Sequence, residues 1–251
     1  MKAIGVIPAR LGSTRLAEKV LKILDGRPMI QHVWERARQS RKLSDLIIAC
    51  DDERILTCAK KFGGKAVLTR SDHPNGTSRV AEIASREDAE VFINIQGDEP
   101  MMHPSAIDQI VEAFEKDPGI NVVTCAVRRH DKEDYENPNV VKVVLGQNGD
   151  GLYFSRAPIP HFRGEASPAW YLKHLGIYGY RKSFLLEFVR WEPGILEEAE
   201  KLEQLRILER GFSIRVIETL HDSWSVDTRE DLETVEAKLK EAGNLRCSQN
   251  A

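Results

Sequence analysis

Short apolar runs rich in β-branched residues alternate with segments of helical periodicity along most of this 251-residue chain. Such alternation is typical of crossover units, in which parallel strands form one sheet and helices cover both of its faces. We therefore predict an α/β protein with a mostly parallel central sheet. The expected strands are residues 3–7, 46–49, 66–68, 91–95, 122–127, 140–145 and 213–218.

Helices are expected between these strands and after them. Pro28 opens a stretch of helical periodicity that extends to about Ser40. Residues 52–61 begin with acidic side chains and end with two lysines, which suits the dipole of a helix. Further helices are expected at residues 184–191, 195–210 and 229–242.

The alternating pattern changes after about Asn137, where prolines interrupt extended segments. Prolines at this density indicate turns, so this region is expected to leave the main sheet. A chain of 251 residues is more often one domain with an accessory lobe than two independent domains. We predict one domain over residues 1–243 with a lobe at about residues 130–180, followed by a flexible tail at residues 244–251.

Composition excludes several classes of protein. No apolar run approaches the roughly 18 to 20 residues that a bilayer span requires, and the run after Met1 and Lys2 is too short for a signal peptide. The four cysteines lack the C-x-x-C spacing of zinc sites. The net charge of -3 gives no support for binding long nucleic acid. We expect a cytoplasmic protein with no nucleic-acid partner and no membrane insertion.

A cation-rich loop, residues 8–19 (PARLGSTRLAEK), directly follows the first expected strand. Ligands of open α/β sheets bind at this carboxyl edge. Backbone N–H groups around Gly12 can approach phosphate oxygens, while Arg10, Arg15 and Lys19 can neutralise a triphosphate. A basic loop can also be merely solvated, and this one has neither the P-loop nor the dinucleotide-binding pattern.

Two carboxylates are candidates for a metal site. Asp98 follows the strand expected at residues 91–95, so it should project into the same crevice as the cation-rich loop. Carboxylate oxygens suit Mg²⁺, which takes further oxygens from substrate phosphates. Asp227 stands just before the last expected helix, where an aspartate taken alone is more readily a helix cap than a metal ligand. Glu99 is left out of the expected metal shell.

Several ordered motifs support a resemblance to a known family. Residues 8–19 resemble the G-x-S/T-x-R-x-P-x-K signature of nucleotidyltransferases that activate sugars. The later motifs look, in this order, like those of CMP-Kdo synthetases, where Kdo is the acidic sugar 3-deoxy-D-manno-octulosonate. They are residues 73–79 (HPNGTSR), 94–100 (NIQGDEP), 153–160 (YFSRAPIP), 174–178 (HLGIY) and 202–206 (LEQLR).

This resemblance covers nearly all of residues 2–241 and implies a fold, an activity and partners. The implied fold is the Rossmann-like nucleotidyltransferase fold, with a homodimer formed through the smaller lobe. The implied activity is transfer of CMP from CTP to Kdo, with release of pyrophosphate, to give CMP-Kdo for lipopolysaccharide biosynthesis. Mg²⁺ is the implied cofactor.

The resemblance also implies roles for particular residues. The implied catalytic residues are Lys19, Arg15, Asp98 and Asp227, of which Asp98 and Asp227 hold the metal. The implied CTP-binding residues are Ala9, Arg10, Gly12, Ser13, Thr14, Arg15, Lys19, Gly76, Thr77, Arg79 and Gln96. The implied sugar-binding residues are Arg156, Arg163, His174, Tyr178, Glu203 and Gln204.

Purely structural roles remain open for several of these residues. Thr77 can cap a helix as well as contact a nucleotide, His174 can be a structural histidine, and Glu203 can belong to an exposed helix face. The family pattern is also incomplete, because Ala17, Ser78 and Ser225 replace a usual proline, a usual acidic residue and a usual glycine. These replacements leave open another acidic sugar, such as 8-amino-Kdo or an acylneuraminate. A nucleotide-sugar-binding protein without catalysis is the remaining alternative.

Overall fold

The computed structural model describes residues 1–12, 16–164 and 169–249, and side-chain environments in the last helix as far as residue 241. The strands within these ranges are β1 (Ala3–Ala9), β2 (Ile23–Leu24), β3 (Arg27–Pro28), β4 (Asp45–Cys50), β5 (Ala66–Leu68), β6 (Val91–Asn94), β7 (Val122–Arg129), β8 (Lys142–Leu145), β9 (Gly151–Ser155), β10 (Tyr171–Arg181) and β11 (Arg215–Thr219). The helices are α1 (Met29–Ala37), α2 (Glu53–Lys61), α3 (Gly76–Arg86), α4 (Pro104–Lys116), α5 (Lys132–Glu136), α6 (Lys182–Phe188), α7 (Ile195–Glu200), α8 (Leu205–Glu209) and α9 (Arg229–Gln249), with a 3₁₀ turn at η1 (Lys19–Leu21).

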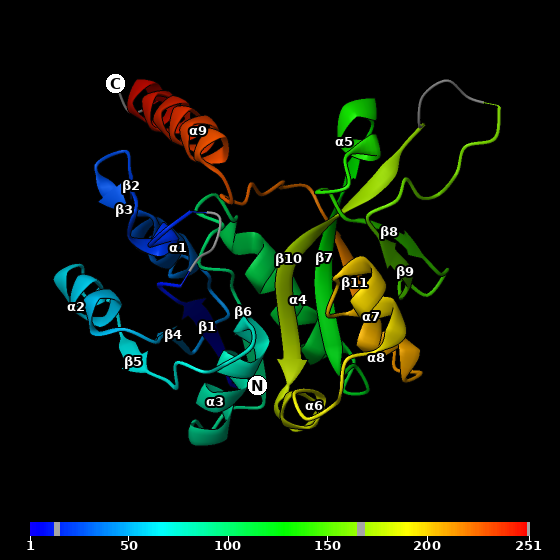
Figure 1. Cartoon of the computed structure of the whole chain (residues 1–251), viewed down its shortest axis with the longest axis horizontal. Helices are drawn as coiled ribbons and strands as arrows, with labels where there is room; N and C mark the ends of the chain where they lie inside the picture. The colour runs from blue at the N-terminus through cyan, green and yellow to red at the C-terminus, as the bar shows by residue number, and fades with distance from the viewer. Residues whose placement is uncertain (13–15, 165–168, 250–251) are drawn as a thin grey trace.

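One mixed sheet runs through the described residues in the order β11-β7-β10-β6-β1-β4-β5 (Figure 1). Parallel pairing joins β1 to β4 and β6, β4 to β5, and β7 to β11. Strand β10 runs antiparallel between β6 and β7, and it also pairs with β8, which carries β9 beside it. The sheet is therefore parallel in its N-terminal half and interrupted by one long antiparallel strand.

The apolar pattern did not predict the central strand β10, nor the shorter strands β2, β3 and β9. The residues of β10 fall mostly within the lobe expected at residues 130–180, yet the strand lies in the middle of the sheet. Lys173 and His174 break the apolar run because their side chains line a pocket and not the core. The helix expected at residues 195–210 is also divided, into α7 and α8, with Lys201 between them in the left-handed conformation at a φ of 54°.

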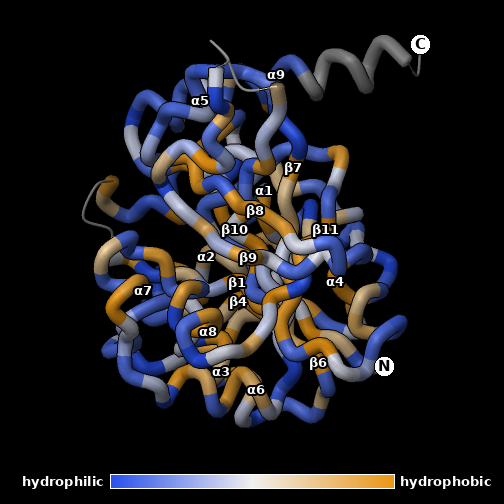
Figure 2. Tube along the Cα trace, turned by 90° about the vertical axis from the view of Figure 1, so that its right-hand side faces the viewer, coloured by the Kyte–Doolittle hydropathy of each residue, from blue (hydrophilic) through white to orange (hydrophobic). Residues whose placement is uncertain are grey.

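Helices cover both faces of the sheet, as the alternation predicted. On β1, Ala3 and Ile7 pack into the cluster formed with α1, α2 and α4, whereas Ile4 and Val6 pack into the cluster formed with α3, α6 and α8. All four side chains are fully buried. A strand that is buried on both faces has a continuous run of apolar residues. This run is why β1 could be predicted from the sequence. Figure 2 shows the apolar strands in the middle of the molecule.

Close packing of α4 against β10 explains a glycine in the central strand. A Cβ atom added at Gly179 would lie 2.4 Å from Ile110 Cγ2 and 2.7 Å from Phe114 Cε2, both on α4. Any larger residue would push the helix away from the sheet. The strand that carries the pocket residues is thus fixed against its supporting helix.

A third, smaller core holds α9 against the β2–β3 hairpin. Leu24 and Met29 pack there against Val226, Val235 and Leu239. This packing fixes the chain just before α9, where Asp227 lies. Helix α9 extends to Gln249 and so includes most of the segment expected as a tail, whose flexibility stays a prediction. Among the described helices, none is long and apolar enough to cross a membrane.

Candidate active site

Two pockets open at the carboxyl ends of the parallel strands. The smaller pocket has a cavity volume of about 280 Å³ and lies between the end of β1 and the start of α3. The larger pocket has a volume of about 710 Å³ and lies between β10, the segment before β8, and the segment before α9. Gln96 and Asp227 line both pockets, so molecules bound in the two would meet at these side chains.

Lys19 joins the two candidate metal carboxylates where the pockets meet. Its Nζ atom donates to Asp98 Oδ2 at 2.6 Å and to Asp227 Oδ1 at 2.8 Å. Burial alone would lower the pKa of Lys19, but the negative charges of Asp98 and Asp227 outweigh it, and the net effect raises the pKa. The backbone holds the same contact, because Val226 N donates to Asp98 O at 2.9 Å.

The helix cap at the start of α9 is made by Thr228, not by Asp227. Thr228 Oγ1 accepts from Asp231 N at 3.1 Å, and Asp231 Oδ2 accepts from the backbone nitrogens of Asp227 and Thr228. This reciprocal arrangement satisfies the backbone N–H groups of Asp227, Thr228 and Asp231. Thr228 thus takes part in the cap, while the Asp227 carboxylate accepts from Lys19 and lines both pockets.

The carboxylate pair fits a magnesium ion better than a transition metal. Oxygens of Asp98 and Asp227 contact one nitrogen atom, so they lie close enough to contact one cation. Among the described residues no cluster of three or more His, Cys, Asp or Glu side chains could enclose a metal. A site with two carboxylates suits Mg²⁺, which keeps several waters and takes oxygens from substrate phosphates.

Five of the expected CTP-binding residues, besides Lys19, stand in or beside the smaller pocket. Ala9, Arg10, Gly76, Arg79 and Gln96 line it. Arg79 is 2% exposed, and its Nη1 donates to Thr69 Oγ1 at 2.6 Å and to Arg70 O at 3.0 Å. This guanidinium therefore also anchors the wall of the pocket.

The remaining expected CTP-binding residues lie elsewhere. Gly12 is exposed and is not among the residues that line either pocket. Thr77 lines the larger pocket. The expectations for Ser13, Thr14 and Arg15 fall outside the described residues.

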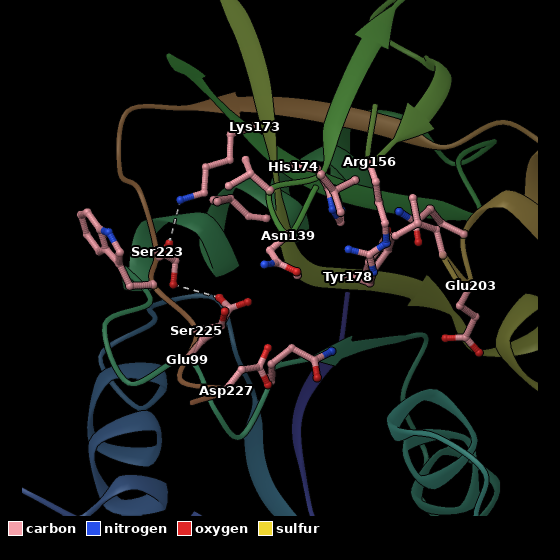
Figure 3. Close-up of a pocket in the computed structure, with 18 of the residues that line it drawn as sticks. Glu99, Asn139, Arg156, Lys173, His174, Tyr178, Glu203, Ser223, Ser225 and Asp227 are labelled. Carbon is pink, nitrogen blue, oxygen red and sulfur yellow. Dashed lines mark hydrogen bonds between the residues drawn. The ribbon is translucent and has the colours of Figure 1, made fainter. Parts of the chain in front are cut away.

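The larger pocket brings together most of the expected sugar-binding residues. Arg156, His174, Tyr178, Glu203 and Gln204 all line it, and Figure 3 shows Arg156, His174 and Tyr178 on one wall with Asp227 across the cavity. Arg163 is exposed and is not among the lining residues, so its contact with a sugar stays a prediction.

Arg156 is held in the wall of the larger pocket by backbone carbonyls. Its Nε donates to Glu200 O at 2.8 Å and its Nη1 to Pro138 O at 2.9 Å. A guanidinium has five N–H donors, so others remain for a ligand carboxylate. The side chain is positioned before any ligand enters.

His174 is a poor proton acceptor in this pocket. Burial lowers the pKa of the His174 imidazole to about 3. Its Nε2 lies 3.0 Å from Thr124 Oγ1, which in turn donates to Ile177 O at 2.7 Å. Because the hydroxyl has one proton, donation to Ile177 O leaves it as the acceptor for an Nε2–H group. A hydrogen-bonding role suits this neutral ring better than general-base catalysis.

Glu203 connects the larger pocket to the turn beside the smaller one. Its carboxylate accepts from Asn75 Nδ2 at 2.8 Å and from Thr77 Oγ1 at 2.6 Å, and Arg206 Nη2 lies 3.1 Å from it. Asn75 lines the smaller pocket and also caps α3 by accepting from Ser78 N. The two pockets thus share one hydrogen-bond network.

Glu99 holds the segment that leads to Asp227. Its carboxylate accepts from Ser223 Oγ at 2.9 Å, and Lys173 Nζ donates to Ser223 O at 3.3 Å (Figure 3). Burial, together with the charge of Asp98, raises the pKa of Glu99 to about 7. Through its bond to Ser223, the Glu99 carboxylate positions the segment before α9.

Sequence reasoning missed several residues of the larger pocket. Asn94, Asn139, Lys173 and Ser223 line it. Asn94 is 1% exposed, and its Oδ1 is buried without a hydrogen-bond partner among the described residues, as is Nε2 of Gln204. The signal for Asn94 and Lys173 was their place inside or beside the quoted motifs, whereas Asn139 had no signal beyond the neighbouring Pro138.

Comparison with known proteins identifies similar sequences over the whole chain. A family model described as cytidylyltransferase matches residues 4–218. The 3-deoxy-manno-octulosonate cytidylyltransferase of Solibacter usitatus is 49% identical over 239 residues, which cover 95% of each chain. The protein of the same description from Geobacter sulfurreducens is 45% identical over 250 residues, covering 96% of this chain and 100% of that one.

Solved structures agree with the sequence comparison. CMP:2-keto-3-deoxy-manno-octonic acid synthetase complexed with CTP superposes with a TM-score of 0.91 at 41% identity, covering 96% of this chain and 100% of that one. A cytidylyltransferase from Leptospira borgpetersenii, 18% identical with a TM-score of 0.63, shares the fold. The predicted α/β nucleotidyltransferase fold is confirmed.

Proposed function

Since the chain belongs to the 3-deoxy-manno-octulosonate cytidylyltransferase family, we propose that it transfers CMP from CTP to 3-deoxy-D-manno-octulosonate (Kdo) and releases pyrophosphate. CTP enters the smaller pocket, and the acidic sugar enters the larger one. The observation that carries this assignment is that Gln96 and Asp227 line both pockets. A nucleotide and a sugar that meet there can react directly with each other.

The reaction needs no covalent intermediate on the protein. The C2 hydroxyl oxygen of the sugar bonds to the α-phosphorus of CTP, the bond from that phosphorus to the pyrophosphate oxygen breaks, and the hydroxyl proton passes to solvent. Lys19 lies beside both carboxylates and can turn its ammonium to the departing pyrophosphate. Holding the two substrates in line supplies much of the rate enhancement.

We propose that Asp98 and Asp227 hold Mg²⁺ during this reaction. The support is the position of their carboxylate oxygens around one shared contact atom. The ion supplies positive charge that offsets the repulsion between an anionic sugar and a triphosphate. Lys19 makes the same carboxylate pair stable when substrates are absent, because its ammonium neutralises part of their charge.

Arg156 is proposed to orient the sugar by its carboxylate. The guanidinium is fixed in the pocket wall by Glu200 O and Pro138 O, so its remaining donors keep one direction. Tyr178 and Gln204 are 8% and 7% exposed, and they offer polar atoms to the sugar hydroxyls from the same pocket. His174 adds a neutral hydrogen-bonding group.

The test is pyrophosphate release by the purified protein with each of CTP, UTP, ATP and GTP, crossed with Kdo, 8-amino-Kdo and sialic acid, with and without Mg²⁺. Release with CTP and Kdo in the presence of Mg²⁺ is the expected result. Faster release with 8-amino-Kdo or sialic acid would transfer the assignment to that sugar. Binding of CTP without release of pyrophosphate for any of the sugars would show that the protein binds nucleotides but does not catalyse the transfer.

We also propose that the protein is a cytoplasmic homodimer that pairs through residues 130–180. Support for a partner surface comes from Trp170, which is 37% exposed and lies beneath Arg128 at 4.8 Å from the ring centroid. A monomer in sedimentation at micromolar concentration would exclude the dimer. Fractionation of cells that express the tagged chain tests the location, with the cytoplasmic fraction expected to contain it.

A further inference from the structure

A lysine lies buried behind the wall of the larger pocket, and it forms no ion pair with an acidic side chain of the described residues. Lys142, the first residue of β8, is 0% exposed. No carboxylate of the described residues forms an ion pair with its ammonium. Burying an unpaired charge is costly, so a lysine at such a position is seldom kept for packing alone.

Three backbone carbonyls accept hydrogen bonds from the three N–H groups of this ammonium. Lys142 Nζ donates to Asn137 O at 3.0 Å, Val140 O at 2.6 Å and Arg156 O at 2.7 Å. An ammonium has three N–H donors, so each is used once. The acceptors belong to the two segments that flank the ammonium, one before β8 and one after β9.

Both of these segments form the wall of the larger pocket. Asn137, Asn139, Val140 and Arg156 line it. The Arg156 guanidinium also donates to Pro138 O, so Lys142 and Arg156 both tie the same two segments together. Lys142 is fully buried and is not among the lining residues, so its positive charge lies behind the wall to which Arg156 belongs.

We propose that Lys142 is a positioning residue for the acidic sugar, which fixes the wall segment 137–141 against Arg156 and places a positive charge behind the carboxylate site. It cannot touch the substrate, because its side chain is fully buried. This inference rests on the proposed function, since it needs an anionic ligand in the larger pocket. According to this proposal, part of the preference of the larger pocket for an acidic sugar comes from a residue that does not line the pocket.

The protonation of Lys142 gives this proposal a readout that packing alone does not share. Burial lowers the pKa of Lys142 to about 8. The charged groups around it are Glu200 and Asp134, which favour the ammonium, and Arg156, which opposes it. Lys173, its neighbour across the strand pair on β10, is engaged by Asp222 at 2.9 Å.

Loss of this proton would loosen the wall. Above a pH of about 8 a neutral amine has two N–H donors, so one of the three carbonyls loses its partner and the positive charge disappears. The KM for Kdo should therefore rise as the pH passes through 8, while the KM for CTP stays level. The Kdo carboxylate remains ionised throughout this range.

The decisive experiment compares Lys142→Met with the unchanged protein by steady-state pyrophosphate release. We expect the KM for Kdo to rise about tenfold or more, as when a supporting residue behind a binding site is lost, and the KM for CTP to stay within about twofold. The methyl ester of Kdo, which lacks the negative charge, is used as a competitor. Its inhibition constant should change much less than the KM for the acid.

A matched control is Lys182→Met. Lys182 Nζ also donates to a backbone carbonyl, Glu87 O at 2.8 Å, but it lines neither pocket. This variant should leave both KM values unchanged. If Lys142→Met alters the acid and the ester equally, the lysine has only a structural role and the proposal is wrong.

The pH series on the unchanged protein keeps the proposal testable if Lys142→Met does not fold. A KM for Kdo that stays flat between pH 7 and pH 9 would contradict it. The result is distinct from failure of the proposed function, which would appear as no pyrophosphate release from CTP and Kdo at any pH.

Discussion

The smaller and the larger pocket meet at Gln96 and Asp227 but are built in different ways. The smaller pocket is formed mainly by short loops that follow parallel strands β1 and β6 and by the turn before α3. The larger pocket is assembled around the antiparallel strand β10 from segments far apart in the chain. The smaller pocket is a feature of the fold class, whereas the larger pocket is an addition to it.

This difference suggests how the two pockets divide the work. Ligand sites at the carboxyl edge of a parallel sheet recur among α/β proteins, whereas the specificity of each depends on what is added nearby. Changes in the smaller pocket and at the carboxylate pair should therefore reduce turnover itself. Changes in the larger pocket should reduce mainly the affinity for the sugar.

The largest effect is expected at the carboxylate pair. Asp98→Ala leaves Lys19 with Asp227 alone and removes one of the two proposed magnesium ligands. We expect kcat to fall about 10³-fold or more, because charge stabilisation of the transition state is lost. Chelation of Mg²⁺ with EDTA should stop pyrophosphate release in the unchanged protein.

The matched control for this prediction is Asp88→Ala. Asp88 is an exposed aspartate in the loop between α3 and β6 and lines neither pocket. Its replacement should leave kcat unchanged. Undiminished turnover by Asp98→Ala would exclude Asp98 from the metal site and with it the proposed mechanism.

A smaller effect, confined to one substrate, is expected from Arg156→Lys. Lysine keeps the charge but lacks the fork that Glu200 O and Pro138 O hold in place. Loss of a hydrogen bond to a charged group costs about 1.5–3 kcal/mol, which corresponds to about a 10- to 100-fold rise in the KM for Kdo. The KM for CTP should not change.

Arg163→Lys separates the two arginines that the sequence suggested. Arg163 is exposed and absent from the pocket lining, so its replacement should alter the KM for Kdo by less than about twofold, as for most surface changes. A large rise for Arg163→Lys together with none for Arg156→Lys would show that the sugar carboxylate binds outside the larger pocket.

The same contrast explains how much the sequence could predict. Strands β1, β4 and β6 are buried on both faces, so their continuous apolar runs could be recognised in the sequence. The loops after β1 and β6 could then be placed at the carboxyl edge of the sheet. Asp98 and Lys19 were placed at that edge from the residues alone. The family resemblance was needed to prefer Asp227 as a ligand over Asp227 as a cap.

The larger pocket could not be derived in this way. Strand β10 carries Lys173 and His174 toward a cavity, which breaks the periodicity that marks a core strand. The residues that line the pocket come together only through antiparallel pairing of β10 with β7 and β8, for which the sequence has no local signal. Lys142 lies in an expected strand, yet nothing in the alternation shows that its ammonium is buried.

A pH measurement tests whether the larger pocket binds or also transfers protons. Because the pKa of His174 is lowered to about 3, its imidazole should stay neutral between pH 5 and pH 8. His174→Gln should therefore weaken Kdo binding without changing the shape of the kcat profile. Disappearance of an ionisation from that profile in His174→Gln would instead indicate that the histidine acts as a base.

The same histidine should affect stability in a defined direction. Unfolded histidine has a pKa of about 6.5, so below that pH the unfolded state takes up a proton that the folded state refuses. The free energy of unfolding should fall from pH 6.5 toward pH 3 by up to about 1.4 kcal/mol per pH unit from this group. In urea unfolding of His174→Gln, this part of the pH dependence of the unfolding free energy should be absent.

The smallest effect is expected where the two pockets are connected. Glu203→Gln replaces one acceptor oxygen by an amide nitrogen, so Asn75 and Thr77 cannot both donate to it, and the Thr77 hydroxyl must turn to accept from the new amide. A neutral hydrogen bond is worth about 0.5–1.5 kcal/mol, so the KM values for Kdo and CTP should each rise about 2- to 10-fold. Both should change because Asn75 lines one pocket and Glu203 the other.

Glu197→Gln is the control that isolates this connection. Glu197 also contacts Arg206, at 2.8 Å, but it lines neither pocket, and within the described residues it forms no hydrogen bond to the turn before α3. It should leave both KM values within about twofold of the unchanged protein. If Glu203→Gln raises the KM for Kdo alone, Glu203 is simply a sugar ligand, and the two pockets communicate only through Gln96 and Asp227.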